Sequence, residues 1–166
     1  MIKQKLTLLA VIVATFVGMS AANASSYHQK AVGTWLVTVE FPEGGPPPFK
    51  EFLVFNAGGT LTETNTTLHA NSALNPASPL PLNGSMGSGA WKRIGKGAVK
   101  FTFIKLVFSA NGVHEGYLRV SGKARIHGNH WTGEASTELL FGTDLDNPLS
   151  VIPFGTAPSS GNRIKP

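Results

Sequence analysis

The chain has 166 residues with no cysteine, and its 14 basic and 9 acidic residues give a formal net charge of +5. The absence of cysteine excludes disulfides and thiolate metal sites. The small positive excess lacks the clustered basic face of a nucleic-acid-binding protein. The composition therefore indicates one globular domain that is stabilised by packing alone.

The first 24 residues have the features of an export signal. Lys3 and Lys5 precede an uncharged, mainly apolar run, and Ala22-Asn23-Ala24 is the small-x-small pattern that signal peptidases cleave. The run is shorter than the roughly 20 residues of a membrane-spanning helix. We therefore expect cleavage after Ala24 and a mature domain of residues 25–166 in the periplasm or outside the cell. This domain has no membrane span, and because two lysines leave with the signal its net charge is +3.

Beyond the signal, the sequence predicts β-strands and no helix. Glycine and proline are frequent, and no segment keeps a 3.6-residue apolar period. The first strand alternates cleanly, with Trp35, Val37 and Val39 on one face and Thr34 and Thr38 on the other. The expected strands are 33–41, 49–56, 60–68, 89–94, 98–109, 113–126, 130–141 and a short last one within 151–164.

The connections predict how these strands are joined. Glycine-containing turns predict tight hairpins, and sequential hairpins form an up-and-down meander. We expect an all-β, antiparallel, up-and-down barrel of about eight strands rather than a two-sheet sandwich, because closure removes exposed strand edges. The longer connections all fall at one end of such a barrel: 42–48, 69–88 and 142–150. This asymmetry favours a mouth, although long loops can also simply accumulate insertions.

The inward face of the predicted barrel combines small and large residues. Gly116, Gly122, Ala124, Gly133 and Ala135 leave room for a cavity, which an eight-stranded barrel can just contain. Large side chains crossing from the far wall are the alternative, and the candidates are Trp35, Trp91, Trp131, Phe101, Phe103 and Phe108. The basic stretch of Lys92, Arg93, Lys96, Lys100 and Lys105 is interpreted as solvated surface, with alternation splitting several of these residues between faces.

Gly33-Thr34-Trp35 at the start of the first strand resembles the Gly-x-Trp signature of lipocalins and related calycin barrels. The resemblance implies that Trp35 closes the narrow end of the barrel and that a late basic residue, here Arg163, packs across its ring. Lipocalins bind small hydrophobic molecules and are commonly exported. The chain departs from the family in lacking disulfide cysteines and a helix after the last strand. Segments 55–59 and 89–91 also resemble small exported bacterial proteins of unassigned function.

The sequence therefore favours a binding module for a small apolar or amphipathic ligand. The expected wall of its pocket is Val37, Val39, Leu118, Val120, Trp131, Ala135 and Leu139, with Gly33, Trp35 and Arg163 as structural residues of the barrel end. A small barrel enzyme of the cyclase or isomerase type is one alternative, and it would need Tyr117, His114 or Glu63 inside the barrel. A surface protein that displays its proline-rich loops to a partner is another.

No motif predicts catalysis or a cofactor. The chain has neither a Gly-x-Ser-x-Gly elbow nor a phosphate-binding glycine loop. His127 and His130, even with His114, fall short of a zinc site, which needs three or four converging ligands. The residues Asp144, Asp146 and Asn147 are interpreted as turn capping, because calcium needs six to eight oxygens. No metal site is predicted, and the sequence leaves the oligomeric state and the identity of any ligand open.

Overall fold

The computed structural model describes residues 30–43, 47–65 and 83–166. The predicted export signal, 1–24, and most of the long connection 69–88 lie outside the described residues. The strands are β1 (Gly33–Val39), β2 (Phe49–Phe55), β3 (Thr60–Asn65), β4 (Asn83–Gly84), β5 (Gly87–Gly95), β6 (Ala98–Phe108), β7 (His114–His127), β8 (His130–Phe141) and β9 (Ser150–Arg163).

The sheet closes into an eight-stranded antiparallel barrel, as the sequence predicts. Neighbours follow the order β1, β2, β3, β5, β6, β7, β8 and β9, and β9 pairs back with β1 to complete the ring. The short β4, which precedes β5 in the sequence, also pairs with β6. It was not among the expected strands. Strand β9 has 14 residues, so the expectation of a short last strand is wrong. The described residues contain no helix long and apolar enough to cross a membrane.

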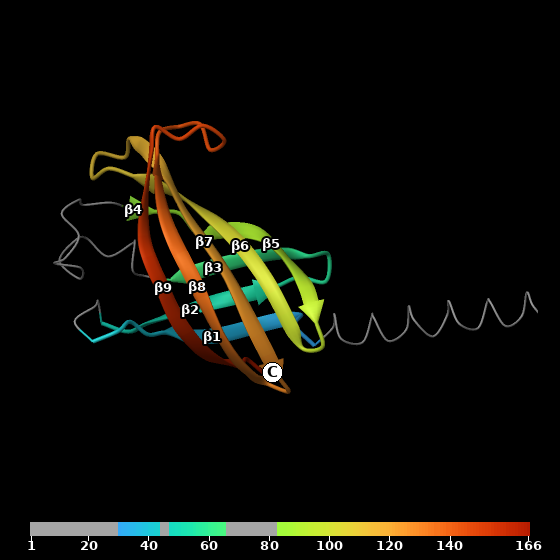
Figure 1. Cartoon of the computed structure of the whole chain (residues 1–166). Helices are drawn as coiled ribbons and strands as arrows, with labels where there is room; N and C mark the ends of the chain where they lie inside the picture. Colours follow the sequence, from blue (N-terminus) through green and yellow to red (C-terminus); the bar gives the residue numbers. More distant parts are fainter. Residues whose placement is uncertain (1–29, 44–46, 66–82) are drawn as a thin grey trace, which may run out of the picture.

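The two ends of the barrel differ (Figure 1). The connections β1–β2, β6–β7 and β8–β9 lie at one end, which we call the loop end, and β3 ends there as well. Tight turns between β2 and β3, β5 and β6, and β7 and β8 lie at the opposite end, the turn end. Strands β6 to β9 extend past β1, β2 and β3 toward the loop end, because β9 pairs with β8 from Ser150 but with β1 only from Ser159.

Aromatic rings fill the turn end. The ring of Phe55, 1% exposed, has its centroid 5.3 Å from that of Trp91, 5.5 Å from that of Trp131 and 6.1 Å from that of Phe101. Indole nitrogens in this layer have acceptors: that of Trp131 donates to Ser159 Oγ over 3.1 Å. The aromatic layer therefore buries several large apolar side chains in the core of the barrel.

The aromatic rings pack into space left by glycines on the inward face of the strands. A Cβ added at Gly122 would lie 2.4 Å from the Phe101 ring, and one at Gly89 would lie 2.0 Å from the Thr102 carbonyl oxygen. Glycine at these positions therefore permits close packing between strands and core. The expectation that small residues leave a cavity fails at Gly122, where an aromatic side chain takes the space.

Arg163 packs against Trp35 near the start of the first strand, β1. Its guanidinium carbon lies 4.4 Å from the Trp35 ring centroid, which is the contact that the sequence resemblance implies. The guanidinium also donates to the backbone carbonyls of Val32 and Lys30. Partial burial lowers the pKa of Arg163. Gly33 has φ of +131°, and an added Cβ would meet the guanidinium at 2.6 Å, so this position suits glycine.

Candidate functional site

Three side chains with ionisable groups lie inside the barrel near the loop end. Glu63 is 0% exposed, Lys105 is 1% exposed and Glu51 is 8% exposed. Each belongs to the inward face of its strand, and in β6 Lys105 alternates with the buried Phe103 and Val107. The interpretation of Lys105 as solvated surface is therefore wrong. Charged groups buried in a barrel wall cost free energy unless each has a partner, so their contacts define the site.

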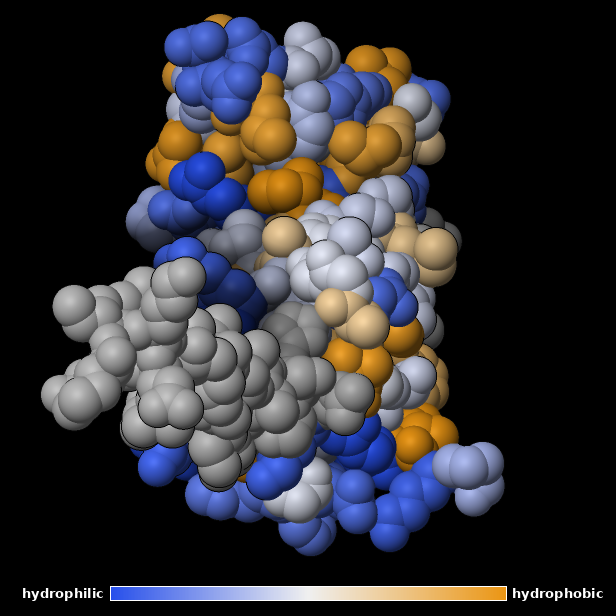
Figure 2. Space-filling view, turned by 90° about the vertical axis from the view of Figure 1, so that its right-hand side faces the viewer, coloured by the Kyte–Doolittle hydropathy of each residue, from blue (hydrophilic) through white to orange (hydrophobic). Residues whose placement is uncertain are grey.

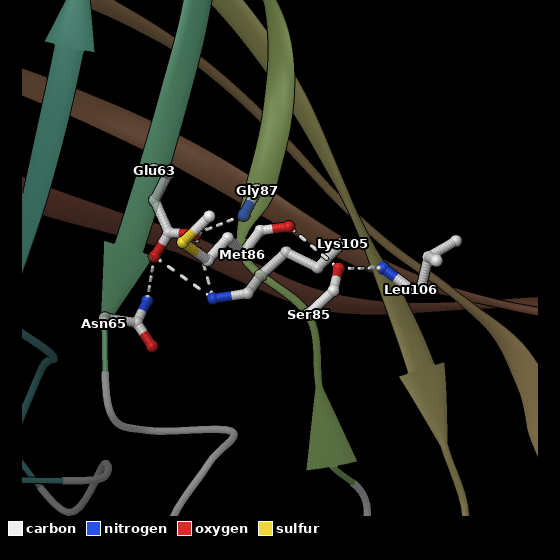
Figure 3. Close-up of polar contacts among 7 residues, drawn as sticks. All are labelled: Glu63, Asn65, Ser85, Met86, Gly87, Lys105 and Leu106. Carbon is white, nitrogen blue, oxygen red and sulfur yellow. Dashed lines mark hydrogen bonds and ion pairs between the residues drawn. The ribbon is translucent and has the colours of Figure 1, made fainter. Parts of the chain in front are cut away.

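Glu63 is the centre of this charged cluster (Figure 3). Lys105 Nζ lies 2.9 Å from Glu63 Oε2 and donates to Oε1 over 3.1 Å. The backbone N–H of Gly87 donates to Oε2 over 3.1 Å, and the Asn65 side-chain amide also donates to Oε1. With donors from three strands, both oxygens of the Glu63 carboxylate have hydrogen-bond partners.

Glu51 is the second carboxyl of the cluster, on the strand beside Glu63. It pairs with Asn65 in the β2–β3 register, and Asn65 also hydrogen-bonds its side chain. Burial, and then repulsion from Glu63, raise the pKa of Glu51 from its ordinary value of 4.5 to about 8, against the opposing effects of Asn65 and Lys105. Glu51 is therefore a neutral carboxylic acid at neutral pH, able to donate a hydrogen bond into the barrel.

The raised pKa of Glu51 predicts a pH dependence of stability. Unfolding returns Glu51 to water, where it ionises above its ordinary pKa of 4.5. The contribution of the neutral acid is thus complete below about pH 4.5 and is lost as the pH rises through about 8. We expect the free energy of unfolding to fall by about 2–4 kcal/mol across this range relative to Glu51→Gln. Urea unfolding of both proteins from pH 4 to pH 9 measures the difference, and a constant difference would contradict the assignment.

Gly87 makes room for the ion pair. A Cβ at this position would lie 2.7 Å from Glu63 Oε2 and 2.7 Å from Phe103 Cδ2. Gly87→Ala should therefore push Glu63 away from Lys105 and lower the free energy of unfolding by about 1–3 kcal/mol. Gly58→Ala is the matched control, because an added Cβ there meets nothing within 4 Å. Equal denaturation midpoints for the two variants would rule out this role for Gly87.

The predicted wall residues divide between two environments. Val37 and Trp131 belong to the buried hydrophobic core, where Val37 pairs with Glu51 in the β1–β2 register, and Val39, Val120 and Ala135 are partly buried against that core. The other two continue the row of Lys105 across the sheet, because Lys105 pairs with Leu118 and Leu118 pairs with Leu139. Leu139 in turn pairs with Ile152, which was not predicted. The structure thus places an apolar wall directly beside the charged cluster.

Apolar residues are also exposed at the loop end. Figure 2 shows apolar surface gathered toward the upper end of the molecule, the end at which Figure 1 places the β8–β9 connection. Leu149 is 87% exposed, Phe154 62%, Ile152 46% and Val151 45%. Single exposed apolar residues are ordinary, but these four lie within six positions around the start of β9, where Val151 and Ile152 point to opposite faces of the strand. We call these four residues the apolar rim.

Of the three residues of which an enzyme would need at least one inside, the structure places Glu63 there. Tyr117 lies on the face opposite Leu118, and its hydroxyl donates to the Thr143 carbonyl over 2.7 Å. The His114 ring lies 4.9 Å from that of Tyr117. The residues that the structure describes contain no group of three His, Asp or Glu suited to a metal ion. Asp144 caps its own turn, and hydrogen bonds from Asn147 and from the Asp146 backbone lower its pKa.

An open groove of about 410 Å³ lies on the outer surface of β6 to β9. Its outward side chains are hydroxyls and charges, including Thr102, Ser121 and Ser136. Thr102 and Ser121 hydrogen-bond each other over 3.0 Å, so these two hydroxyls of the groove already have a partner within the protein. The groove offers polar contacts on the solvent side of the sheet and has no connection with the buried charges.

The comparisons with known proteins give no assignment: no family model, no curated protein and no solved structure matches the chain. The candidate site therefore depends on its own geometry. Sequence reasoning missed Glu51 and Lys105, although alternation places Glu51 with Leu53 and Phe55, and Lys105 with Phe103 and Val107. A charged residue in phase with buried apolar neighbours was the available signal.

Proposed function

We propose that this protein is an exported, lipocalin-like barrel that binds a small amphipathic ligand inside its loop end. The observation that carries the proposal is a buried charged cluster beside an apolar wall, Leu118 and Leu139, within a closed barrel. A purely structural core does not need this cluster, because apolar residues of similar size are often as stabilising as a buried ion pair. A polar head group and an apolar chain match the two parts of the site.

Three further features support this proposal. The closed antiparallel barrel is an architecture that can hold one small ligand. The Trp35–Arg163 contact, which the lipocalin resemblance implies, lies at the turn end, opposite the charged cluster. The apolar rim would give an apolar chain a favourable first contact at the loop end. Burial of the chain would then supply most of the affinity.

Titration with a dansylated alkylamide, a probe that has an apolar chain and no carboxylate, tests this function. We expect saturable binding, a blue shift of the dansyl emission, and displacement by unlabelled amphiphiles. Leu118→Trp would fill the proposed site and should weaken binding at least about tenfold. Leu106→Trp is the control, because Leu106 is 41% exposed on the opposite face of the neighbouring strand. Equal affinities for the two variants would place the probe outside the barrel.

Glu51 favours a second candidate, a small barrel enzyme that transfers a proton. A carboxyl group whose pKa is about 8 can act as a general acid or base at neutral pH. Such an enzyme would convert a bound amphiphile, and its rate would change near pH 8 and vanish in Glu51→Gln. Mass spectrometry of amphiphiles incubated with the protein separates the candidates: unchanged ligands favour binding alone, and a Glu51-dependent product favours catalysis.

A further inference from the structure

The charges of the buried cluster do not balance when both carboxyls are ionised. Two carboxyl groups, Glu51 and Glu63, face a single ammonium, Lys105, whose Nζ is 2.9 Å from Glu63. Neither Arg119 nor Arg163 adds a second cation to the cluster, because Arg119 pairs with Glu138 at 2.8 Å on the outer face and Arg163 lies at the turn end. Within the described part of the chain, the side chain that hydrogen-bonds Glu51 is the neutral amide of Asn65.

We infer that the loop end of the barrel selects amphiphiles with a cationic nitrogen head group, and that Glu51 is the residue that binds the cation. This inference rests on the proposed binding function and names its substrate class. An ammonium beside Glu51 would supply the missing positive charge, so both carboxyl groups would have a cationic partner. A primary ammonium also has three N–H donors, so it can donate to both oxygens of the Glu51 carboxylate.

Other head groups fit the same site less well. A carboxylate would add a third acid to a site that already holds Glu51 and Glu63, and like charges at close range are strongly unfavourable. An alcohol would exchange one neutral hydrogen bond for another and gain little over water. The apolar wall beyond Lys105 would accept the same alkyl chain in each case, so the head group alone decides the preference.

Binding of the cation requires that Glu51 lose its proton. Without a bound cation, Glu51 is a neutral acid below about pH 8. The balanced step is that an alkylammonium and the Glu51 carboxylic acid give a bound alkylammonium–carboxylate pair, and the released proton passes to the buffer. By linkage, the bound cation lowers the pKa of Glu51, and ionisation of Glu51 strengthens cation binding. Release of a proton on binding is therefore the result expected if Glu51 binds the cation.

Isothermal titration calorimetry with three probes of equal chain length tests the inference: decylammonium, decanol and decanoate. At pH 7 we expect decylammonium to bind at least about tenfold more tightly than either of the others. Titrations in buffers of different ionisation enthalpy should show release of close to one proton per decylammonium bound at pH 7. At pH 9.3 Glu51 is already ionised, so the release should nearly disappear.

Glu51→Gln should remove both the preference for decylammonium and the proton release. Glu134→Gln, on the exposed outer face, is the matched control and should change neither. If all three probes bind the unchanged protein equally, or decanoate binds best, the inference is wrong while the binding function stands. If none of the three binds, the proposed function fails as well. The pH dependence of proton release tests Glu51 even if Glu51→Gln does not fold.

Discussion

Lys105→Met should lower the free energy of unfolding by about 3–5 kcal/mol at pH 7. The substitution keeps the length of the side chain but removes the ammonium that lies 2.9 Å from Glu63. Glu63 is 0% exposed, so the variant must either bury an uncompensated carboxylate or protonate it. Urea unfolding of the variant and the unchanged protein at pH 7 measures the loss.

Two further variants separate charge pairing from general damage to β6. Lys100→Met removes an exposed lysine from the same strand and should change the stability by no more than about 0.5 kcal/mol. Combining Lys105→Met with Glu63→Leu replaces the pair by apolar groups and should recover most of the loss. A Lys105→Met protein as stable as Lys100→Met would show that the pair does not compensate a buried charge.

Phe55→Ala should also be strongly destabilising, by about 3–5 kcal/mol. Phe55 is 1% exposed and contacts the rings of Trp91, Phe101 and Trp131, so its removal leaves a void that several rings must share. Phe52→Ala on the same strand is the control, because Phe52 is 41% exposed on the outer face. We expect thermal unfolding to show a large fall in Tm for Phe55→Ala and a fall several times smaller for Phe52→Ala. Similar falls would contradict the assigned core.

Alternation of apolar residues predicted most of the barrel. It placed Trp35 and Val37 of β1, and Leu118 and Val120 of β7, on the inward face where the structure has them. The glycine turns predicted the neighbour order, since each short turn forces antiparallel pairing of sequential strands. The length of β9 was underestimated because Pro153, Gly155 and Pro158 resemble turn residues, whereas the strand accommodates Gly155 at φ +89° beside a register shift.

The candidate site was harder to predict than the fold. Glu63 was considered as an interior residue. Its partner Lys105 is 42 positions away in the sequence, and no local pattern specifies such a contact. Residue type also misled: Lys105 follows other lysines in a basic stretch, and lysine is almost never fully buried without a partner. The pKa of Glu51 depends on burial and on the charge of Glu63, and both follow from the closed barrel.

The most direct test of the central claim is where an amphiphile binds, measured by intermolecular nuclear Overhauser effects in the complex with decylammonium. The account predicts contacts from the alkyl chain to the methyl groups of Leu118 and Leu139, and from the methylene next to nitrogen to Glu51. Contacts confined to Leu149 and Phe154 of the apolar rim, or to the outer groove beside Thr102, would place the ligand outside the barrel and contradict the account.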